Sequence, residues 1–236
     1  MNNQVKSFLV FFLLLSLTSS AQLLFNMGSY RNLVYTSVGY NGFFGNSTVG
    51  VARREYFKLI KKEVIGIFDV SLPISDKFFT KHVIKKGFQF TIFENKKIKI
   101  PFTFASSSIA RRNSFLRYND ITAEFTINPG IYSAKYSFAL DCKYELIVFR
   151  HIMYSQRYKK EIDAAVQNKW TNPLFNIFKI GIVGGLNLKR WVIYIKTGYE
   201  RNPFSNKKNI PGYIVLGLGL KLGTKTMKNK PTTDLP

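Results

Sequence analysis

The chain has 236 residues, of which 46% are hydrophobic and 16% aromatic, and so apolar a composition excludes an intrinsically disordered protein. Its 35 Lys and Arg residues against 13 Asp and Glu give a net charge of +22, which favours anionic partners such as nucleic acid, acidic lipid or lipopolysaccharide. A single cysteine, Cys142, excludes an intramolecular disulfide and a cysteine-rich metal site.

The chain begins with the pattern of a secretory signal peptide. A polar start with one lysine precedes the apolar run Phe8–Leu17, and Ser19-Ser20-Ala21 supplies small residues where a signal peptidase cleaves. The apolar run is shorter than the roughly 20 residues of a transmembrane helix. We expect residues 1–21 to be removed. N-terminal sequencing of the envelope protein should therefore begin at Gln22, and a sequence beginning at Met1 would contradict export.

After this segment the sequence alternates between large apolar and small or polar residues with period two, which indicates β-strands. The alternating segments are residues 33–40, 48–59, 64–74, 83–93, 98–105, 119–128, 135–149, 178–188, 191–201 and 213–222. Segment 48–59 alternates least clearly because Arg53, Arg54 and Glu55 interrupt it. We therefore expect eight to ten strands, with ten favoured.

The two faces of these strands differ in character. The last segment places Leu216, Leu218 and Leu220 on one face, while Gly217, Gly219 and a lysine lie on the other. A soluble barrel would turn the apolar face inwards, whereas a transmembrane barrel turns it towards lipid and keeps a polar lumen. The period alone fits both architectures.

The connections between the segments alternate in length. Residues 60–63, 94–97, 129–134 and 189–190 form short connections, and residues 41–47, 75–82, 106–118, 150–177 and 202–212 form longer ones. Short periplasmic turns and long extracellular loops are typical of membrane barrels. Together with the export signal, this asymmetry favours the transmembrane barrel.

These features give the chain a resemblance to a known family. The export site at residues 19–22, the alternating segments and the closing strand at residues 212–223 resemble those of the small outer-membrane β-barrel proteins of Gram-negative bacteria. The resemblance implies an all-β, antiparallel up-and-down barrel over residues 22–223, located in the bacterial outer membrane and placed there by the barrel insertion machinery. Such barrels commonly end on an aromatic residue, whereas a polar, basic tail, residues 224–236, follows here.

Charged residues recur on the polar face of the strands. They are Lys99, Glu124, Asp141, Lys143, Glu145, Lys179, Lys196, Glu200 and Lys221. The lumen of a ten-stranded barrel is narrow, so we expect these charges to face it and to pair or stay hydrated. One interpretation is a salt-bridge network that fills and rigidifies the barrel, which is favoured because small barrels fill their interiors with side chains. The other is a selective pore or substrate path.

The sequence shows no recognisable arrangement of catalytic residues. His151 shares its loop with Ser155 and Asp163, but a triad is defined by geometry rather than by the presence of its residues. His82 is the other histidine. We expect neither an enzyme nor a cofactor or metal site. The same loop contains a possible short helix at residues 158–167, either a lid or receptor-binding element or a solvated cap over the barrel mouth.

The sequence therefore predicts a monomeric barrel with a structural, narrow-pore or adhesion role. Basic residues near both rims would meet the phosphates of outer-membrane lipid and lipopolysaccharide, and export argues against a nucleic-acid partner. Two alternatives remain open at this point. One is a secreted soluble β-barrel that binds an apolar ligand, and the other is an envelope enzyme acting on lipid A.

Overall fold

The structure is a computed structural model. It describes residue 27 and residues 30–40, 45–57, 62–74, 81–95, 98–112, 115–173, 175–201 and 212–224. The predicted signal peptide, residues 1–21, and the predicted C-terminal tail beyond residue 224 lie outside the described residues.

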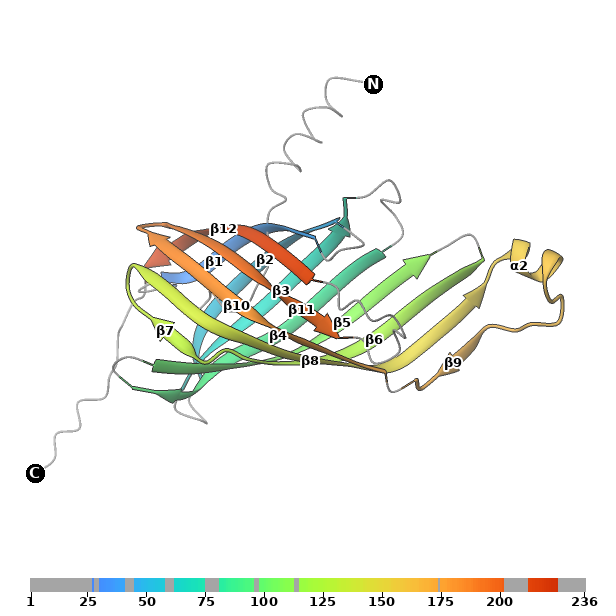
Figure 1. The fold of residues 1–236 in the computed structure, drawn as a ribbon, viewed down its shortest axis with the longest axis horizontal. Coiled ribbons are helices and arrows are strands. Elements are labelled where there is room, and N and C mark those ends of the chain that lie inside the picture. Colours follow the sequence, from blue (N-terminus) through green and yellow to red (C-terminus); the bar gives the residue numbers. More distant parts are fainter. Residues whose placement is uncertain are drawn as a thin grey trace, which may run out of the picture.

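Ten long strands form a closed antiparallel barrel within the described residues (Figure 1). They are β1 (Tyr30–Tyr40), β2 (Gly45–Phe57), β3 (Lys62–Pro73), β4 (Lys81–Glu94), β5 (Ile98–Arg112), β6 (Leu116–Ile127), β8 (Tyr136–Tyr154), β10 (Phe175–Leu188), β11 (Trp191–Arg201) and β12 (Gly212–Thr224). Each strand pairs with the long strand that follows it, and β1 pairs with β12. The predicted barrel of ten strands is confirmed, including the strand expected from the poorly alternating segment 48–59.

The stagger of the strands determines the width of the barrel. Directly paired residues can be followed from Leu188 on β10 through every long strand and back to β10 at Asn176, a shift of 12 residues. In a ten-stranded barrel this shift corresponds to a strand tilt of about 40° and a backbone radius of about 10 Å. Side chains from opposite walls can therefore meet inside.

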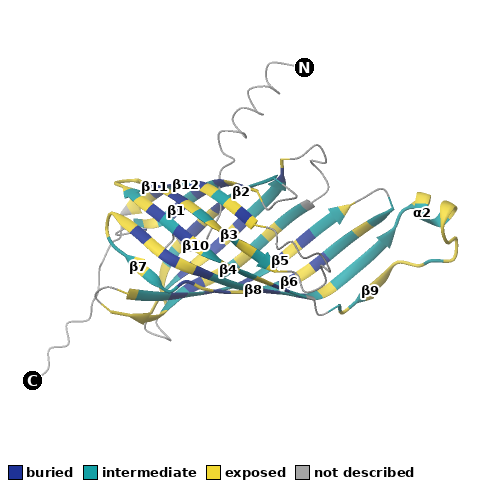
Figure 2. Ribbon diagram, viewed as in Figure 1, coloured by how far each residue is buried: buried dark blue, intermediate teal, exposed yellow. Residues whose placement is uncertain are grey.

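The apolar face of the strands lies outside the barrel. Ile182, Phe88 and Leu216 are 42%, 42% and 56% exposed, whereas Asp141 and Gln89 on the inner face are fully buried. Figure 2 shows this alternation along each strand. A continuous exposed belt of large apolar residues marks a surface that contacts lipid. The soluble alternative, which requires the apolar face of the strands to point inwards, is therefore wrong.

Helices play little part in the fold. Among the described residues, no helix combines the length and the apolar character needed to cross a bilayer.

The prediction of a long loop at residues 106–118 is wrong. Strand β5 continues to Arg112 and β6 begins at Leu116, so the two strands form a ribbon paired as far as Arg112 and Arg117. The ribbon extends past the neighbouring strands (Figure 1). Its outward positions on β5 include Ser106 and Ser108. A strand that approaches the lipid head groups and then leaves the membrane needs no continuous apolar outer face, so the alternation that identifies the lower part of β5 fades here.

The turn predicted at residues 129–134 is also shorter than expected. Strand β7 (Gly130–Tyr132) pairs with both β5 and β8 in the register of β6, so it prolongs β6. The ladder passes through the proline, because the carbonyl of Pro129 accepts from the amide of Leu140 at 3.0 Å. Proline removes one ladder donor without ending the strand. The turn itself covers only residues 133–135.

The predicted loop at residues 150–177 contains more regular structure than expected. Strand β8 continues to Tyr154, helix α2 (Gln156–Glu161) follows, and β9 (Lys169–Thr171) pairs back onto β8. The helix begins earlier and is shorter than the predicted 158–167, because Ser155 caps it by accepting from the amide of Tyr158 at 3.1 Å.

The topology gives a prediction that can be tested on intact cells. In a Cys142→Ser background, Gln167→Cys lies in the α2–β9 connection and Arg190→Cys in the tight turn between β10 and β11; both positions are exposed. We expect a membrane-impermeant maleimide to label Gln167→Cys on whole cells, and Arg190→Cys only after the outer membrane is permeabilised. The reverse pattern would invert the orientation.

Candidate functional site

The nine predicted lumen charges all occupy inward-facing positions of the strands. Five of them belong to two neighbouring clusters of ion pairs, which meet on β8 and are together called the network. Glu124, Lys143 and Glu145 form one cluster, and Asp141 and Lys196 form the other. The other four form local contacts: Lys179 with Glu200 at 2.7 Å, Lys221 with Asn187 at 2.9 Å, and Lys99 with Glu94 near the β4–β5 turn. Sequence reasoning missed two members of the network, Asp69 and Lys85, although both stand on the polar face of alternating segments.

The network runs round the inner wall and passes over intervening strands. Tyr35 on β1 donates to Asp69 on β3, and Nζ of Lys85 on β4 lies 3.1 Å from the same carboxylate. Lys85 also lies 3.7 Å from Glu124 on β6. The other oxygen of Glu124 accepts from Nζ of Lys143 on β8 at 2.5 Å. Because these contacts skip β2 and β5, they hold non-adjacent strands at fixed separations.

Asp141 on β8 continues the network to the other side of the barrel. Its carboxylate pairs with Lys196 on β11 and accepts from the hydroxyl of Tyr213 on β12 at 3.0 Å. Nδ2 of Asn128 donates to it at 3.1 Å. Asp141 is fully buried, so its charge depends on these partners for compensation. Since β12 pairs with β1, the contacts described from Tyr35 to Tyr213 follow most of the barrel circumference.

The charges of the network nearly cancel. Its ionic members are Lys85, Lys143, Lys196, Asp69, Glu124, Asp141 and Glu145. Four carboxylates face three ammonium groups, whereas the whole chain carries +22. The basic excess therefore lies outside this part of the lumen, and the network does not form a cationic path for anions.

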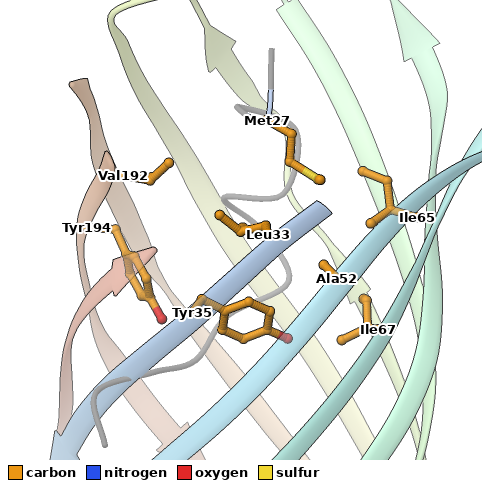
Figure 3. Packing of buried hydrophobic residues seen from close by; sticks show 8 residues of the cluster. All are labelled: Met27, Leu33, Tyr35, Ala52, Ile65, Ile67, Val192 and Tyr194. Atoms are coloured by element: carbon orange, nitrogen blue, oxygen red, sulfur yellow. The ribbon is translucent and has the colours of Figure 1, made fainter. Parts of the chain in front are cut away.

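The lumen below the network, towards the tight turns, is packed with apolar side chains. Met27, Leu33, Val192 and Tyr194 have exposed fractions of 0–4% and belong to one buried cluster. Figure 3 shows Met27 lying over Leu33, with Ile65 and Val192 on either side. Solvent does not reach these side chains, so they fill the periplasmic half of the lumen against β11, β1, β2 and β3 and are called the plug. Met27, which precedes β1, thus contributes to the plug, a role that no strand pattern could indicate.

Glycines allow the luminal tyrosines to lie against the wall. A Cβ atom at Gly50 would overlap the ring of Tyr35, and one at Gly217 would overlap the ring of Tyr194. The absence of a side chain at each glycine leaves room for the ring on the neighbouring strand. The glycines of the polar face therefore serve close packing and do not widen the lumen.

The extracellular extension, defined as residues 107–112, 115–120 and 149–171, is tied together by specific contacts. Arg150 donates to buried Asp120 through Nε at 2.6 Å and Nη2 at 2.9 Å. His151 stacks on Trp170 with ring centroids 4.6 Å apart, and the Trp170 ring is 61% exposed. Cationic side chains exposed on the extension are Arg112, Arg117, Arg157, Lys160 and Lys169.

The three residues that the sequence offers for a catalytic triad each have a structural contact. His151 stacks on Trp170, Ser155 caps α2, and Asp163 accepts from the amide of Ala165. In the part of the chain that the structure describes, no group of three or more His, Cys, Asp or Glu side chains could hold a metal ion.

Comparison with known proteins finds barrels among solved structures. No protein-family model and no curated protein matches the chain. The KdgM porin has a TM-score of 0.40 and 9% identity, covering 81% of this chain and 99% of its own. The NanC porin has the same TM-score and identity, covering 81% and 100%. The translocator domain of autotransporter NalP from Neisseria meningitidis has a TM-score of 0.36 and 9% identity, covering 82% and 88%.

The location follows from the chain's own geometry. The barrel is closed, its outer belt is apolar, and its interior holds paired charges. Only lipid can cover such a belt, and strands cross a membrane only as a closed barrel because every backbone polar group must be paired. The chain is a β-barrel of the bacterial outer membrane.

Proposed function

We propose that this barrel is a closed, monomeric anchor that presents its extracellular extension for adhesion to an anionic surface, and that it is not an open pore. The observation that carries the proposal is the plug, because Met27, Leu33 and Val192 are buried in the lumen of the periplasmic half. Inner residues on the β6–β8 side, Asn128 and Ala139, are 0% and 1% exposed as well. The near-neutral network above the plug supports the same conclusion, since it rigidifies the wall without selecting a permeant ion.

The extension supports the adhesion role. It holds exposed cations beside the exposed ring of Trp170, and Trp and Arg are the residues that contribute most at recognition surfaces. Its bidentate Arg150–Asp120 pair and the Ser155 cap fix the geometry of these groups before a partner arrives, which lowers the entropic cost of binding.

Conductance separates an anchor from a pore. The purified mature chain in a planar bilayer should give no steady current, and an open porin measured in the same bilayer serves as the positive control. Steady ohmic channels from the wild-type chain would overturn the closed-barrel proposal.

Adhesion is tested separately, with heparin as an anionic probe on intact cells. Trp170→Ala and the pair Lys160→Gln with Lys169→Gln should each weaken binding, and added salt should weaken it further. Lys62→Gln, at the periplasmic end, is the matched control and should bind as the wild type does. Equal heparin binding by all variants would contradict a role of the extension in adhesion.

We also propose that the barrel has no catalytic role. This proposal is supported by the structural contacts of His151, Ser155 and Asp163. Lipid A from cells with and without the gene should have the same composition, and a modification that depends on the gene would favour the envelope enzyme instead.

A further inference from the structure

Lys86 is a cation on the lipid-facing surface of the barrel. Its outward neighbours along β4 are Ile84 and Phe88, which are 51% and 42% exposed, and Lys86 is itself exposed. Among the described residues, no acidic side chain forms an ion pair with it. A cation facing lipid is costly, so its presence there indicates a functional site.

Small side chains lie next to Lys86 on β5 and β6. The register places Ser106 directly opposite Lys86 and Ala123 beyond Ser106, while Ser108 lies opposite Ile84. These four residues, Lys86, Ser106, Ser108 and Ala123, are called the serine notch. The notch lies beside the large apolar side chains of Ile84, Phe88 and Phe104, and it offers an ammonium group and two hydroxyl donors.

The notch lies in the outer-leaflet half of the belt. Strand β5 rises from Phe104 through Ser106 and Ser108 into the extracellular extension, and each residue climbs about 2.5 Å at this tilt. The flexible stem of Lys86 can bend upwards along Ser106, so that its ammonium approaches the lipid head groups while its methylene groups stay in the apolar layer.

Aromatic rings form a continuous apolar surface next to the notch and below it. They are Phe88, Phe90, Phe102, Phe104 and Phe125. Neighbouring ring centroids lie 5.2–6.5 Å apart across β4, β5 and β6. A cation with hydroxyl donors above such a surface matches the chemistry of a phosphorylated lipid, with a charged head above acyl chains.

We propose that the serine notch binds the phosphate of an outer-leaflet lipid, the phosphorylated lipid A part of lipopolysaccharide. Lys86, Ser106 and Ser108 donate to the phosphate oxygens, and the acyl chains lie on the phenylalanine surface. A second copy of the chain fits less well, because a two-fold contact between identical patches would bring two Lys86 side chains together.

The test uses the whole mature barrel, refolded in neutral detergent and titrated with lipid A. Wild-type protein should bind saturably. Lys86→Met removes the charge, Ser106→Leu fills the notch, and each should weaken binding about tenfold or more, as loss of one charge-assisted contact predicts. The control Lys62→Met changes an exposed cation of β3 at the periplasmic end and should bind as the wild type does.

Further arms identify the ligand and show that the variants fold. Dephosphorylated lipid A should bind the wild type as weakly as lipid A binds Lys86→Met, and inorganic phosphate at the same concentration should not compete. In phosphatidylcholine vesicles Lys86→Met should unfold at a higher urea concentration than the wild type, because no cation then faces lipid. Equal lipid A binding by Lys86→Met, equal binding of dephosphorylated lipid A, competition by free phosphate, or a dimer lost in Lys86→Met would each overturn the proposal.

Discussion

Replacing Asp141 by alanine is expected to lower the free energy of unfolding by about 3–5 kcal/mol, the cost of removing one partner from a buried ion pair. The carboxylate is fully buried and compensates Lys196, while Tyr213 and Asn128 donate to it. Without it, the ammonium of Lys196 stays in the lumen with its nearest counter-charge removed. Urea midpoints of variants refolded into lipid vesicles measure the loss.

A double-mutant cycle separates the ion pair from general damage. Asp141→Ala combined with Lys196→Met should be less destabilised than the sum of the two single variants, because the second change removes the uncompensated cation. Asp163→Ala, an exposed carboxylate in the extracellular extension, is the control and should change stability by less than about 0.5 kcal/mol. A loss at Asp141 as small as the loss at Asp163 would contradict the network.

Gly217 and Leu218 are neighbours on β12. A larger side chain is expected to destabilise the barrel at Gly217 but to have little effect on its stability at Leu218. A Cβ at Gly217 overlaps the ring of Tyr194 inside the barrel, so Gly217→Ala should cost about 1–3 kcal/mol through overpacking. Leu218 faces lipid, which accommodates changes of shape, so Leu218→Phe should cost little. Leu218→Arg, which places a charge against lipid, should cost about 2–4 kcal/mol near the midplane.

The same refolding experiment compares these three variants. The informative contrast is Gly217→Ala against Leu218→Phe, because the two changes add similar volume but only the first adds it inside the packed lumen. If Leu218→Phe lowered the urea midpoint more than Gly217→Ala, the assignment of the inner and outer faces of β12 would be wrong.

Strand positions were predictable from the sequence wherever the strand touches lipid. In residues 213–222 and 191–201 the lipid-facing positions must be apolar, whereas the inner positions include glycine and lysine, so the period is visible in the sequence itself. The upper part of β5 has water or head groups outside it and keeps no such pattern. Residues 106–118 therefore resemble a loop, although they pair regularly up to Arg112.

The lumen was predictable in composition but not in detail. Alternation places Glu124, Asp141 and Lys196 on the polar face, but their partners depend on register, which the sequence of one strand does not contain. The Tyr35–Asp69 contact passes over a strand. Met27 lies in no strand at all, so no periodicity could place it in the plug.

The contacts around β1 and β12 bear on how the barrel assembles. These two strands meet only when the sheet has curled completely, so the seam between them is the last part of the wall to form. Tyr35 ties β1 to β3 and Tyr213 ties β12 to β8 from inside, so both margins of the seam are braced by strands farther round the wall. To open the seam towards the bilayer, the barrel would have to break these luminal contacts as well as the hydrogen bonds between β1 and β12. The seam is therefore expected to stay closed once insertion is complete.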